Sequence, residues 1–400
     1  MSVVSAKLRQ VKLSPSVAAR AIVANLREQG RRIIDLTVGE PDFPTPDHIR
    51  QAAREAIDRG DTKYPLSQGT LALRRAVQQR LQADVGQSYP VDQIIVSTGA
   101  KQVLYNGLAA SLEAGDEVIV PTPYWVSYPD MVELAGGTPV FAGTSSSEAY
   151  KLIAEVLERA ISPKTKWLML NSPSNPSGAL YSAEELREMA GVLRAHPHVW
   201  VMTDDIYARL SFGGQNAPHL LQVAPDLADR TLVVNGVSKA YAMTGWRIGY
   251  GAGPKDLIKA MAVVQSQSTS GASTIGQVAA LAALTGPQDC VDRFTAVFKE
   301  RRDLAVAILS DVPGLGIVVP DGAFYVFPDC SALIGKKTPS GEVISSDVDL
   351  VQHILSQAGV ALIDGSSYGI ASTFRVSFAA SNDDVRQGCE AIRDVCLALA

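Results

Sequence analysis

Residues 199–207 read VWVMTDDIY, an apolar run rich in β-branched side chains that ends abruptly in two carboxylates and a tyrosine. Short apolar runs bounded by polar residues are typical of strands buried in a parallel sheet. The same pattern stands on both sides of this stretch, because residues 166–176 read KWLMLNSPSNP and residues 231–239 read TLVVNGVSK. We therefore expect a parallel sheet whose strands end in polar residues.

The chain between residues 45 and 290 alternates such runs with amphipathic stretches, which predicts a sheet covered by helices. The expected fold class is therefore α/β, with a mostly parallel sheet flanked by helices. The predicted strands are Ile94–Ser97, Glu117–Val120, Thr138–Phe141, Lys166–Leu170, Val199–Thr203, Thr231–Val234 and Trp246–Gly249, and the helices between them include Gln102–Leu112, Tyr150–Ile161 and Ala183–Arg194.

The C-terminal part of the chain has a different pattern, which predicts a smaller α+β unit. Its expected segments are a long helix, two strand-like runs, a polar loop, a second helix and a last strand: Phe294–Leu309, Gly316–Val319, Ala323–Pro328, Lys336–Ser346, Val348–Gly359 and Thr373–Phe378. We therefore predict a large domain over residues 46–290. An N-terminal arm over residues 1–45 and a small domain over residues 291–400 complete the chain.

The composition favours a globular protein with a large core. Of the 400 residues 46% are hydrophobic, and 36 Lys and Arg against 41 Asp and Glu give a net charge of −5. We expect no nucleic acid partner for such a chain, and its apolar runs fall short of the roughly 18 residues that a membrane span needs. Residues 1–10 carry no apolar segment typical of a secretory signal, so we expect a cytoplasmic protein with four reduced, buried cysteines.

Five consecutive strand ends carry polar or aromatic residues, and in an open parallel sheet these ends meet at the ligand site. The segments are Thr98–Lys101, Pro123–Trp125, Asn171–Pro176, Asp204–Tyr207 and Asn235–Lys239. A lysine, a carboxylate, a tyrosine, an asparagine and an indole at one point suit a flat, anionic, pyridine-like cofactor. Pyridoxal phosphate is such a group, since it needs a lysine for its Schiff base and an acidic partner for its ring nitrogen.

The pattern also offers a place for the phosphate of such a cofactor. Backbone N–H groups of Gly99, Ala100 and Lys101, at the start of a predicted helix, would form an anion cradle. Arg247 lies eight residues after Lys239 and would add a planar, bidentate cation.

Residues 238–249, SKAYAMTGWRIG, resemble the cofactor-lysine signature of the class I aminotransferases of fold type I. The turn at residues 175–178 is similar to their Asn-Pro-Thr/Ser-Gly motif, and residues 204–207 are similar to their Asp-x-x-Tyr motif. Trp125 in PTPYWVSYP, residues 121–129, and the pair Phe374-Arg375 narrow the likeness to aspartate aminotransferases of the bacterial Iβ type. The resemblance runs nearly from end to end, and it implies a fold-type I transferase dependent on pyridoxal phosphate.

The resemblance implies a cofactor role for several residues. Lys239 would carry the cofactor as a Schiff base and move the proton in catalysis, and Asp204 would keep the ring nitrogen protonated. Asn175 and Tyr207 would bond the phenolic oxygen of the ring, and Trp125 would stack on its face.

The resemblance also implies substrate contacts and a partner. Arg375 would clamp the substrate α-carboxylate, with Trp125, Asn175 and the backbone of Gly39 closing over it. Tyr64 would reach the phosphate of the neighbouring subunit, so the family likeness implies a homodimer whose active sites are shared across the interface.

Two features concern details of the family pattern. Many relatives carry a serine three residues before the lysine, where this chain has Gly236, so Ser238 or the backbone would take over at the phosphate. Lys12 occupies the arm where Iβ relatives carry a lysine and would reach a side-chain carboxylate of the substrate. The residues after it differ from the usual pattern, so a solvated arm lysine is the alternative for Lys12. Lys101 is a second candidate for that carboxylate.

These inferences predict an aminotransferase that converts small amino acids and 2-oxo acids, with ping-pong transamination between L-aspartate and 2-oxoglutarate as the main hypothesis. An aromatic or prephenate aminotransferase of the same family is the first alternative, and a pyridoxal phosphate lyase or decarboxylase is the second. A non-enzymatic regulatory derivative is the third, and the presence of Lys239, Asp204, Arg247 and Arg375 together argues against it.

Three other patterns fit their motifs less well. Residues 249–253, GYGAG, lack the third glycine and the acidic partner of a dinucleotide turn. Residues 365–369 match G-x-S-x-G, but no histidine follows them in the chain. His196 and His198 flank a proline and lack the spacing of zinc ligands on a helix, so we predict no metal site.

Overall fold

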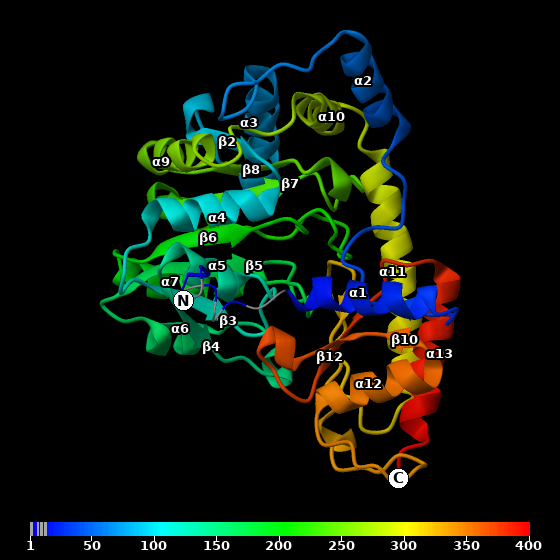
Figure 1. Ribbon diagram of the computed structural model, residues 1–400. Helices are drawn as coiled ribbons and strands as arrows, with labels where there is room; N and C mark the ends of the chain where they lie inside the picture. Colours follow the sequence, from blue (N-terminus) through cyan, green and yellow to red (C-terminus); the bar gives the residue numbers. More distant parts are fainter. Residues whose placement is uncertain (1–2, 6–7, 9–10, 12–13) are drawn as a thin grey trace.

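The computed structural model describes residues 3–5, 8, 11 and 14–400, and its centre is a mixed sheet of seven strands (Figure 1). The strands lie in the order β2-β8-β7-β6-β5-β3-β4, and β8 alone is antiparallel to its neighbours. Their bounds are β2 (Ile94–Ser97), β3 (Glu117–Pro121), β4 (Thr138–Ala142), β5 (Thr165–Asn171), β6 (Trp200–Asp204), β7 (Thr231–Gly236) and β8 (Gly249–Ala252). The predicted, mostly parallel sheet is confirmed.

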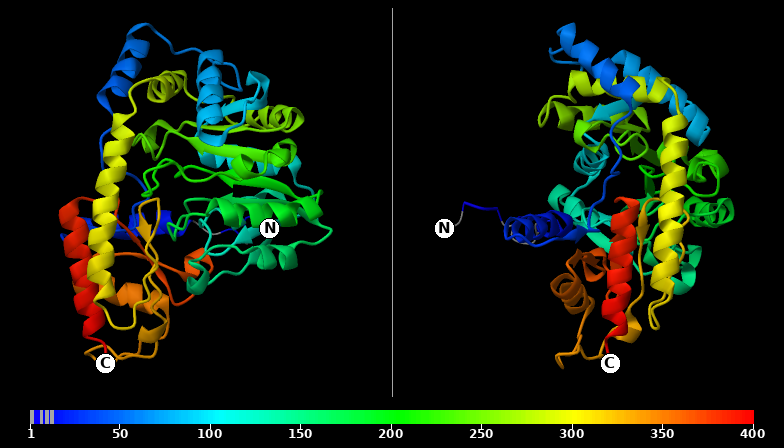
Figure 2. Two further views of the ribbon diagram at one scale, coloured as in Figure 1. Left: turned by 180° about the vertical axis from the view of Figure 1, so that it is seen from behind. Right: turned by 90° about the vertical axis from the view of Figure 1, so that its right-hand side faces the viewer.

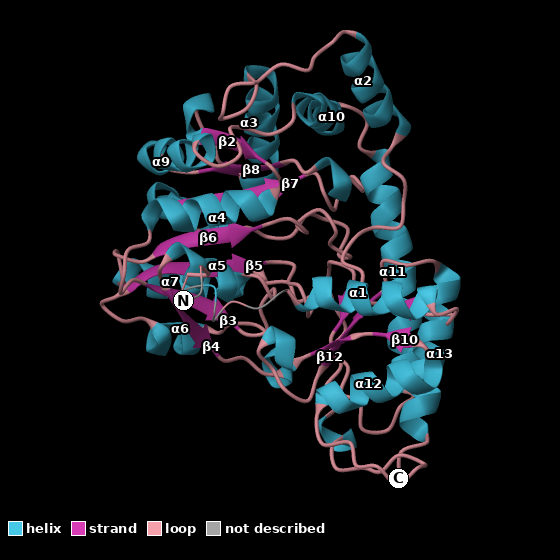
Figure 3. Ribbon diagram, in the orientation of Figure 1, coloured by secondary structure: helices cyan, strands magenta, loops and turns pink. Residues whose placement is uncertain are grey.

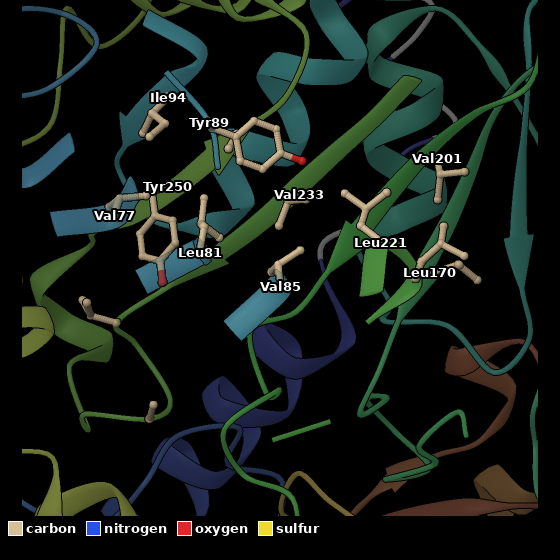
Figure 4. Packing of buried hydrophobic residues seen from close by; sticks show 14 of the residues in the cluster. Val77, Leu81, Val85, Tyr89, Ile94, Leu170, Val201, Leu221, Val233 and Tyr250 are labelled. Carbon is tan, nitrogen blue, oxygen red and sulfur yellow. The ribbon is translucent and has the colours of Figure 1, made fainter. Parts of the chain in front are cut away.

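Helices cover both faces of this sheet, as Figure 3 shows by its colours. Side chains alternate along a strand, so in β5 Trp167 and Met169 join one core while Leu168 and Leu170 join the other. The helices against the first core are α4 (Ala100–Ser111), α5 (Tyr128–Ala135) and α9 (Lys255–Ser266); those against the second include α3 (Leu71–Val85), α6 (Ala154–Ala160), α7 (Ala183–Ala195), α8 (Leu220–Val223) and α10 (Thr274–Thr285). Figure 4 shows α3 packing on β7 and β8 in the second core, and α2 (Asp47–Asp58) packs on α10.

The C-terminal lobe is built along a long helix, α11 (Asp289–Ser310), which runs from the edge of the large sheet to the far end of the lobe (Figure 2). Its other elements are α12 (Asp347–Ala358), α13 (Asn382–Leu397) and an antiparallel sheet in the order β11-β12-β9, with β9 (Tyr325–Val326), β11 (Ile363–Asp364) and β12 (Phe374–Ser377). The N-terminal segment joins this lobe, because β1 (Ile34–Asp35) pairs in parallel with β10 (Val360–Ala361). The first described helix, α1 (Pro15–Glu28), lies between the lobe and the large sheet (Figure 1).

Arg301 fastens the loop that follows β1 to the C-terminal lobe. Its guanidinium donates to both carboxylate oxygens of Asp42 at 2.7 and 2.9 Å, and its Nε donates to Asn382 Oδ1 at 2.7 Å. The side chain is buried and also lies 5.2 Å from the ring of Phe43. Bidentate arginine–carboxylate pairs fix geometry, so Arg301 ties the loop to α11 and α13.

One predicted strand is wrong. Residues Thr244–Trp246 form a turn of 3-10 helix, and the strand expected over Trp246–Gly249 is β8, which begins at Gly249. A Cβ on Gly249 would lie 2.1 Å from the amide nitrogen of Ala100, so α4 can approach β8 only where glycine stands. Glycine has low strand propensity, so the glycine that this packing requires made the bounds of β8 hard to recognise in the sequence.

Other predicted elements differ in extent. The run Gly316–Val319 forms only an isolated bridge between Gly316 and Asp329. Tyr150 has a φ of +58°, so α6 begins only at Ala154, whereas α11 begins five residues before the predicted Phe294. The expected boundary between residues 290 and 291 thus falls within the first turn of α11, and the division into domains stays a prediction. Among the described residues, no helix combines the length and apolar content needed to cross a membrane.

Candidate active site

A cavity of about 460 Å³ opens where the carboxyl ends of β3, β5, β6 and β7 face α1 and the C-terminal lobe. This is the edge of the sheet at which the sequence predicted a ligand site. Most of the predicted site residues line the cavity: Gly39, Ala100, Lys101, Trp125, Asn175, Asp204, Tyr207, Ser238, Lys239, Arg247 and Arg375.

Among the described residues, two predicted ones do not line it. Gly99 lies directly behind the wall, next to Arg247. Tyr64 is 93% exposed and does not line the cavity of its own chain. Lys12 lies outside the described residues.

Asp204 ends strand β6 at the floor of the cavity. Its side chain is buried, Tyr128 donates a hydrogen bond to Oδ2 at 2.7 Å, and the amide of Ile206 donates to Oδ1 at 3.3 Å. Burial raises the pKa of Asp204 to about 6, against the lowering effect of the Tyr128 bond, and neighbouring Asp205 raises it further. A carboxylate held in this way is poised to gain stability from a cationic partner in the cavity.

Lys239 follows β7 and points at the same cavity. Its Nζ donates to the carbonyl oxygen of Gly39 and lies 5.9 Å from the ring centre of Tyr207. Burial lowers the pKa of Lys239 to about 8, Glu40 opposes this shift, and Arg247 adds to it. A lysine with this pKa supplies an appreciable fraction of free, nucleophilic amine near neutral pH.

The start of α4 and Arg247 together form a cradle for an anion. Gly99 caps the helix with a φ of +86°, and a Cβ on it would lie 2.3 Å from Arg247 Nη2. Only glycine therefore lets the guanidinium approach the N–H groups at the helix start, where negative charge is favoured. Arg247 is itself fixed, because its Nη1 donates to the carbonyl oxygen of Thr244 at 2.8 Å.

Gly236, the departure from the family pattern, has a structural reason in this chain. A Cβ at this position would lie 3.0 Å from the carbonyl oxygen of Ile248. Ser238, by contrast, lines the cavity beside Lys239.

Trp125 and Lys101 form one side wall. Lys101 Nζ lies 4.6 Å from the Trp125 ring centre and donates to Ser127 Oγ at 3.1 Å. Burial and the nearby charge of Arg247 lower the pKa of Lys101, while Asp130 raises it. The Trp125 ring meets that of Tyr128 edge to face, at 5.5 Å between ring centres.

Arg375 comes from β12 of the C-terminal lobe and is buried. Its Nη1 donates to Asn175 Oδ1 at 2.9 Å and its Nη2 donates to the carbonyl oxygen of Thr37 at 2.5 Å, while its buried Nε has no hydrogen-bond partner among the described residues. A buried guanidinium whose only described hydrogen-bond acceptors are neutral oxygens is suited to receive a carboxylate. The structure thus joins the turn that follows β5, the loop after β1 and the C-terminal lobe at one cation.

Sequence reasoning missed four contributors to the site: Arg20, Glu40, Tyr128 and Tyr325. Glu40 lies between Arg20 Nη2, 3.5 Å from its Oε1, and the hydroxyl of Thr244, which donates to its Oε2 at 2.6 Å. Tyr128 stands three residues after Trp125, in the turn that opens α5, where its amide donates to the carbonyl oxygen of Trp125 at 2.9 Å. No local pattern marks Arg20 or Tyr325, because they come from α1 and β9, outside the large sheet.

The competing motifs have structural roles. Residues 249–253 contain strand β8, and Ser366 in the G-x-S-x-G run donates from its amide and hydroxyl to the buried carboxylate of Asp347. His196 contacts Glu158 at 2.9 Å, and His198 contacts the carbonyl oxygen of Ser162 at 3.1 Å. Among the described residues, no three His, Cys, Asp or Glu side chains are grouped so as to hold a metal.

Comparison with known proteins gives consistent similarities. A family model described as aminotransferase class I and II matches residues 31–392. The aspartate aminotransferase of Rhizobium meliloti (strain 1021) is 48% identical over 392 residues, 98% of this chain and 96% of that protein. A protein of Rickettsia bellii (strain RML369-C), named a probable aspartate/prephenate aminotransferase, is 50% identical over 396 residues, 99% of each chain. The crystal structure of an aspartate aminotransferase from Rhizobium meliloti superposes with a TM-score of 0.97 at 47% identity and covers 100% of both chains.

Proposed function

The chain belongs to the aminotransferase class I and II family, and from this premise we propose that it transfers the amino group of L-aspartate to 2-oxoglutarate. The observation that carries the proposal is that Lys239, just after β7, and buried Asp204, at the end of neighbouring β6, line one cavity with the Arg375 guanidinium from the other lobe. The names of its relatives support aspartate as the donor. An aspartate/prephenate specificity agrees with those names as well, and the experiment below tests donor preference directly.

We infer that the cofactor is pyridoxal phosphate, because the residues present fit each part of it. The amine of Lys239 suits its aldehyde, the Gly99–Arg247 cradle suits its phosphate, and the buried Asp204 carboxylate suits its ring nitrogen. Ser238 and the start of α4 would complete the phosphate contacts. When bound, the cofactor supplies an electron sink for the Cα carbanion of the substrate.

The side chains have separate tasks in this proposal. Asp204 holds a proton at the ring nitrogen, and the Tyr128 hydrogen bond keeps its carboxylate oriented. Lys239, once released as an amine, would take the proton from the substrate Cα and return it to the former aldehyde carbon of the cofactor, on the other side of the nitrogen. Asn175 and Tyr207 donate to the phenolic oxygen, and Trp125 covers the ring and excludes water. Arg375 orients the α-carboxylate so that the Cα proton faces Lys239.

The side chain of a dicarboxylic substrate needs a second cation. Arg20 and Lys101 both line the cavity, and neither side-chain charge is assigned to the cofactor phosphate or to the α-carboxylate. We assign the distal carboxylate to these cations, alongside the predicted Lys12 of the arm. Arg20 stands at the mouth and pairs only loosely with Glu40, at 3.5 Å, so a substrate carboxylate can compete for it.

The expected homodimer and cytoplasmic location remain part of the proposal. Tyr64 is almost fully exposed and does not line the cavity of its own chain, which agrees with a role at the site of a second copy. Analytical ultracentrifugation of the wild type and of Tyr64→Ala tests the homodimer. Cofactor affinity measured for each tests the role of Tyr64 at the site of the second copy.

The absorbance spectrum of the purified protein is the central test. We expect a visible band from the bound cofactor that disappears on addition of L-aspartate without any oxo acid and returns with 2-oxoglutarate. Conversion with L-phenylalanine alone would keep the family but overturn the aspartate assignment. Turnover that needs no oxo acid would favour a lyase, and a protein with no band after reconstitution would contradict the whole proposal.

A further inference from the structure

Tyr325 joins two parts of the site that come from different lobes. Its strand, β9, pairs with β12, where Ser377 lies opposite it and Arg375 stands two residues away on the same face. The guanidinium of Arg375 lies 4.4 Å from the Tyr325 ring centre, and the Tyr325 hydroxyl lies 2.8 Å from the hydroxyl of Tyr207. All three side chains are buried, so these contacts are not diluted by solvent.

The backbone holds the Tyr325 hydroxyl in place from a further side. A Cβ on Gly39 would lie 2.9 Å from the Tyr325 oxygen, so the absence of a side chain at Gly39 makes room for this hydroxyl. The carbonyl of the same glycine accepts from Lys239 Nζ. The Tyr325 hydroxyl therefore lies next to the Tyr207 hydroxyl and next to Gly39, the residue whose carbonyl binds Lys239.

Proton counting decides the direction of the bond between the two tyrosines. Each hydroxyl has one proton to donate, and burial raises the pKa of both, so both are protonated at neutral pH. If Tyr207 donates to the cofactor, as the proposed function requires, Tyr325 must be the donor between them. The positive charge of Arg375 over the Tyr325 ring favours this direction, because a nearby cation makes a phenol a better donor.

We propose that Tyr325 is a positioning residue that donates a hydrogen bond to the Tyr207 oxygen and so keeps the Tyr207 proton free for the cofactor. Through this bond, the charge state of Arg375 changes the strength of the hydrogen bond from Tyr207 to the cofactor. The proposal rests on the proposed function. When a substrate carboxylate neutralises Arg375, Tyr325 becomes a weaker donor and the bond from Tyr207 to the phenolic oxygen weakens with it. Substrate binding in one lobe would in this way adjust the basicity of the cofactor held by the other.

Tyr325→Phe tests this role, since it keeps the ring under Arg375 and removes only the hydroxyl. In the holoenzyme, the pH midpoint of the visible cofactor band should rise by about half a unit, the size expected for one lost hydrogen bond. Tyr207→Phe should raise it more, and the double variant should rise no further than Tyr207→Phe alone. An unchanged midpoint in Tyr325→Phe, or strictly additive shifts, would overturn the proposal.

Succinate, a dicarboxylate without an amino group, tests the same link from the side of Arg375. Saturating succinate should raise the midpoint of the wild type, and in Tyr325→Phe the rise should be smaller. No rise in the wild type, or an equal rise in both, would refute the link through Tyr325. A wild type without any visible band would contradict the proposed function itself, whereas a normal band that Tyr325→Phe leaves unmoved refutes only the role of Tyr325.

Discussion

The floor and the mouth of the cavity are built in opposite ways. On the floor, Asp204 is buried at the end of β6 and Lys239 is half-buried in the turn after β7, and both pKa values are displaced from their usual range. At the mouth, the side chains of Arg20 and Glu40 are 54% and 40% exposed and meet at 3.5 Å. Buried charges are costly to disturb, whereas exposed pairs contribute at most about 1 kcal/mol. We therefore expect the floor to carry the chemistry and the mouth to select the substrate.

Lys239→Ala should have the largest effect, since it removes both the Schiff-base amine and the proton carrier. We expect the rate of transamination to fall at least about 10⁴-fold, with the fold retained. Steady-state kinetics and circular dichroism measure the two quantities, and Lys255→Ala, on the surface, is the matched control. Substantial remaining turnover would show that the floor does not carry the chemistry.

Asp204→Asn should separate activity from stability. The loss of the charged partner for the cofactor should lower kcat by about 10²- to 10³-fold. In the cofactor-free protein the same change should stabilise the fold near pH 8 by about 2–3 kcal/mol, because each unit of pKa shift corresponds to about 1.36 kcal/mol.

The sign of that stability effect follows from the pKa of Asp204, which folding raises from 3.8 to about 6. The folded state then binds more protons than the unfolded state between these values, so wild-type stability falls as pH rises through this window. The advantage of Asp204→Asn should therefore shrink from pH 7 to pH 4 in urea unfolding experiments. A constant or reversed difference would contradict burial of the ionised carboxylate.

Arg20→Ala tests the mouth. We expect the KM for L-aspartate to rise about 5- to 10-fold, since one screened charge contact is lost, while the KM for L-phenylalanine changes less than about twofold. Lys101→Ala should affect aspartate as well but should also weaken cofactor binding, because Lys101 lies against Trp125. Equal changes for both amino acids in Arg20→Ala would remove this residue from side-chain recognition.

Glu40→Gln should have the smallest effect and connects mouth to floor. The rate at which the cofactor-free protein captures pyridoxal phosphate should rise with pH around a midpoint near 8, where Lys239 loses its proton. Glu40 raises the pKa of Lys239, so its neutralisation should move that midpoint down by a few tenths of a unit. Stopped-flow absorbance can resolve this shift, and an upward shift would exclude the expected charge coupling.

The fold and the floor could largely be predicted from the sequence, and the fold-type I architecture is confirmed by solved relatives. Asp204, Asn175 and Lys239 each lie in the short polar segment that follows an apolar run, so local pattern and the geometry of parallel sheets locate them together. The bounds of strand β8 were not predicted correctly, because its close contact with α4 requires a glycine at position 249. Tertiary packing overrides strand propensity there.

The mouth could not be predicted in the same way. Arg20 and Glu40 are brought together only when α1 lies against the loop after β1, and Tyr325 meets Tyr207 only when the two lobes pack. Nothing in a short window of sequence encodes such long-range contacts. The roles assigned to individual site residues, and the site in the partner subunit expected for Tyr64, stay predictions.

The parallel pairing of Ile34 with Val360 has a consequence for biosynthesis. The ribosome synthesises Ile34 roughly 20 to 60 seconds before Val360 at ordinary elongation rates. During that interval the C-terminal lobe, which Thr37 and Gly39 contact in the folded protein, is incomplete, and Arg375 has not yet been synthesised. A nascent chain can therefore complete its large sheet early and still lack the arginine proposed to hold the substrate. We expect the enzyme to stay inactive until the last segments have been synthesised.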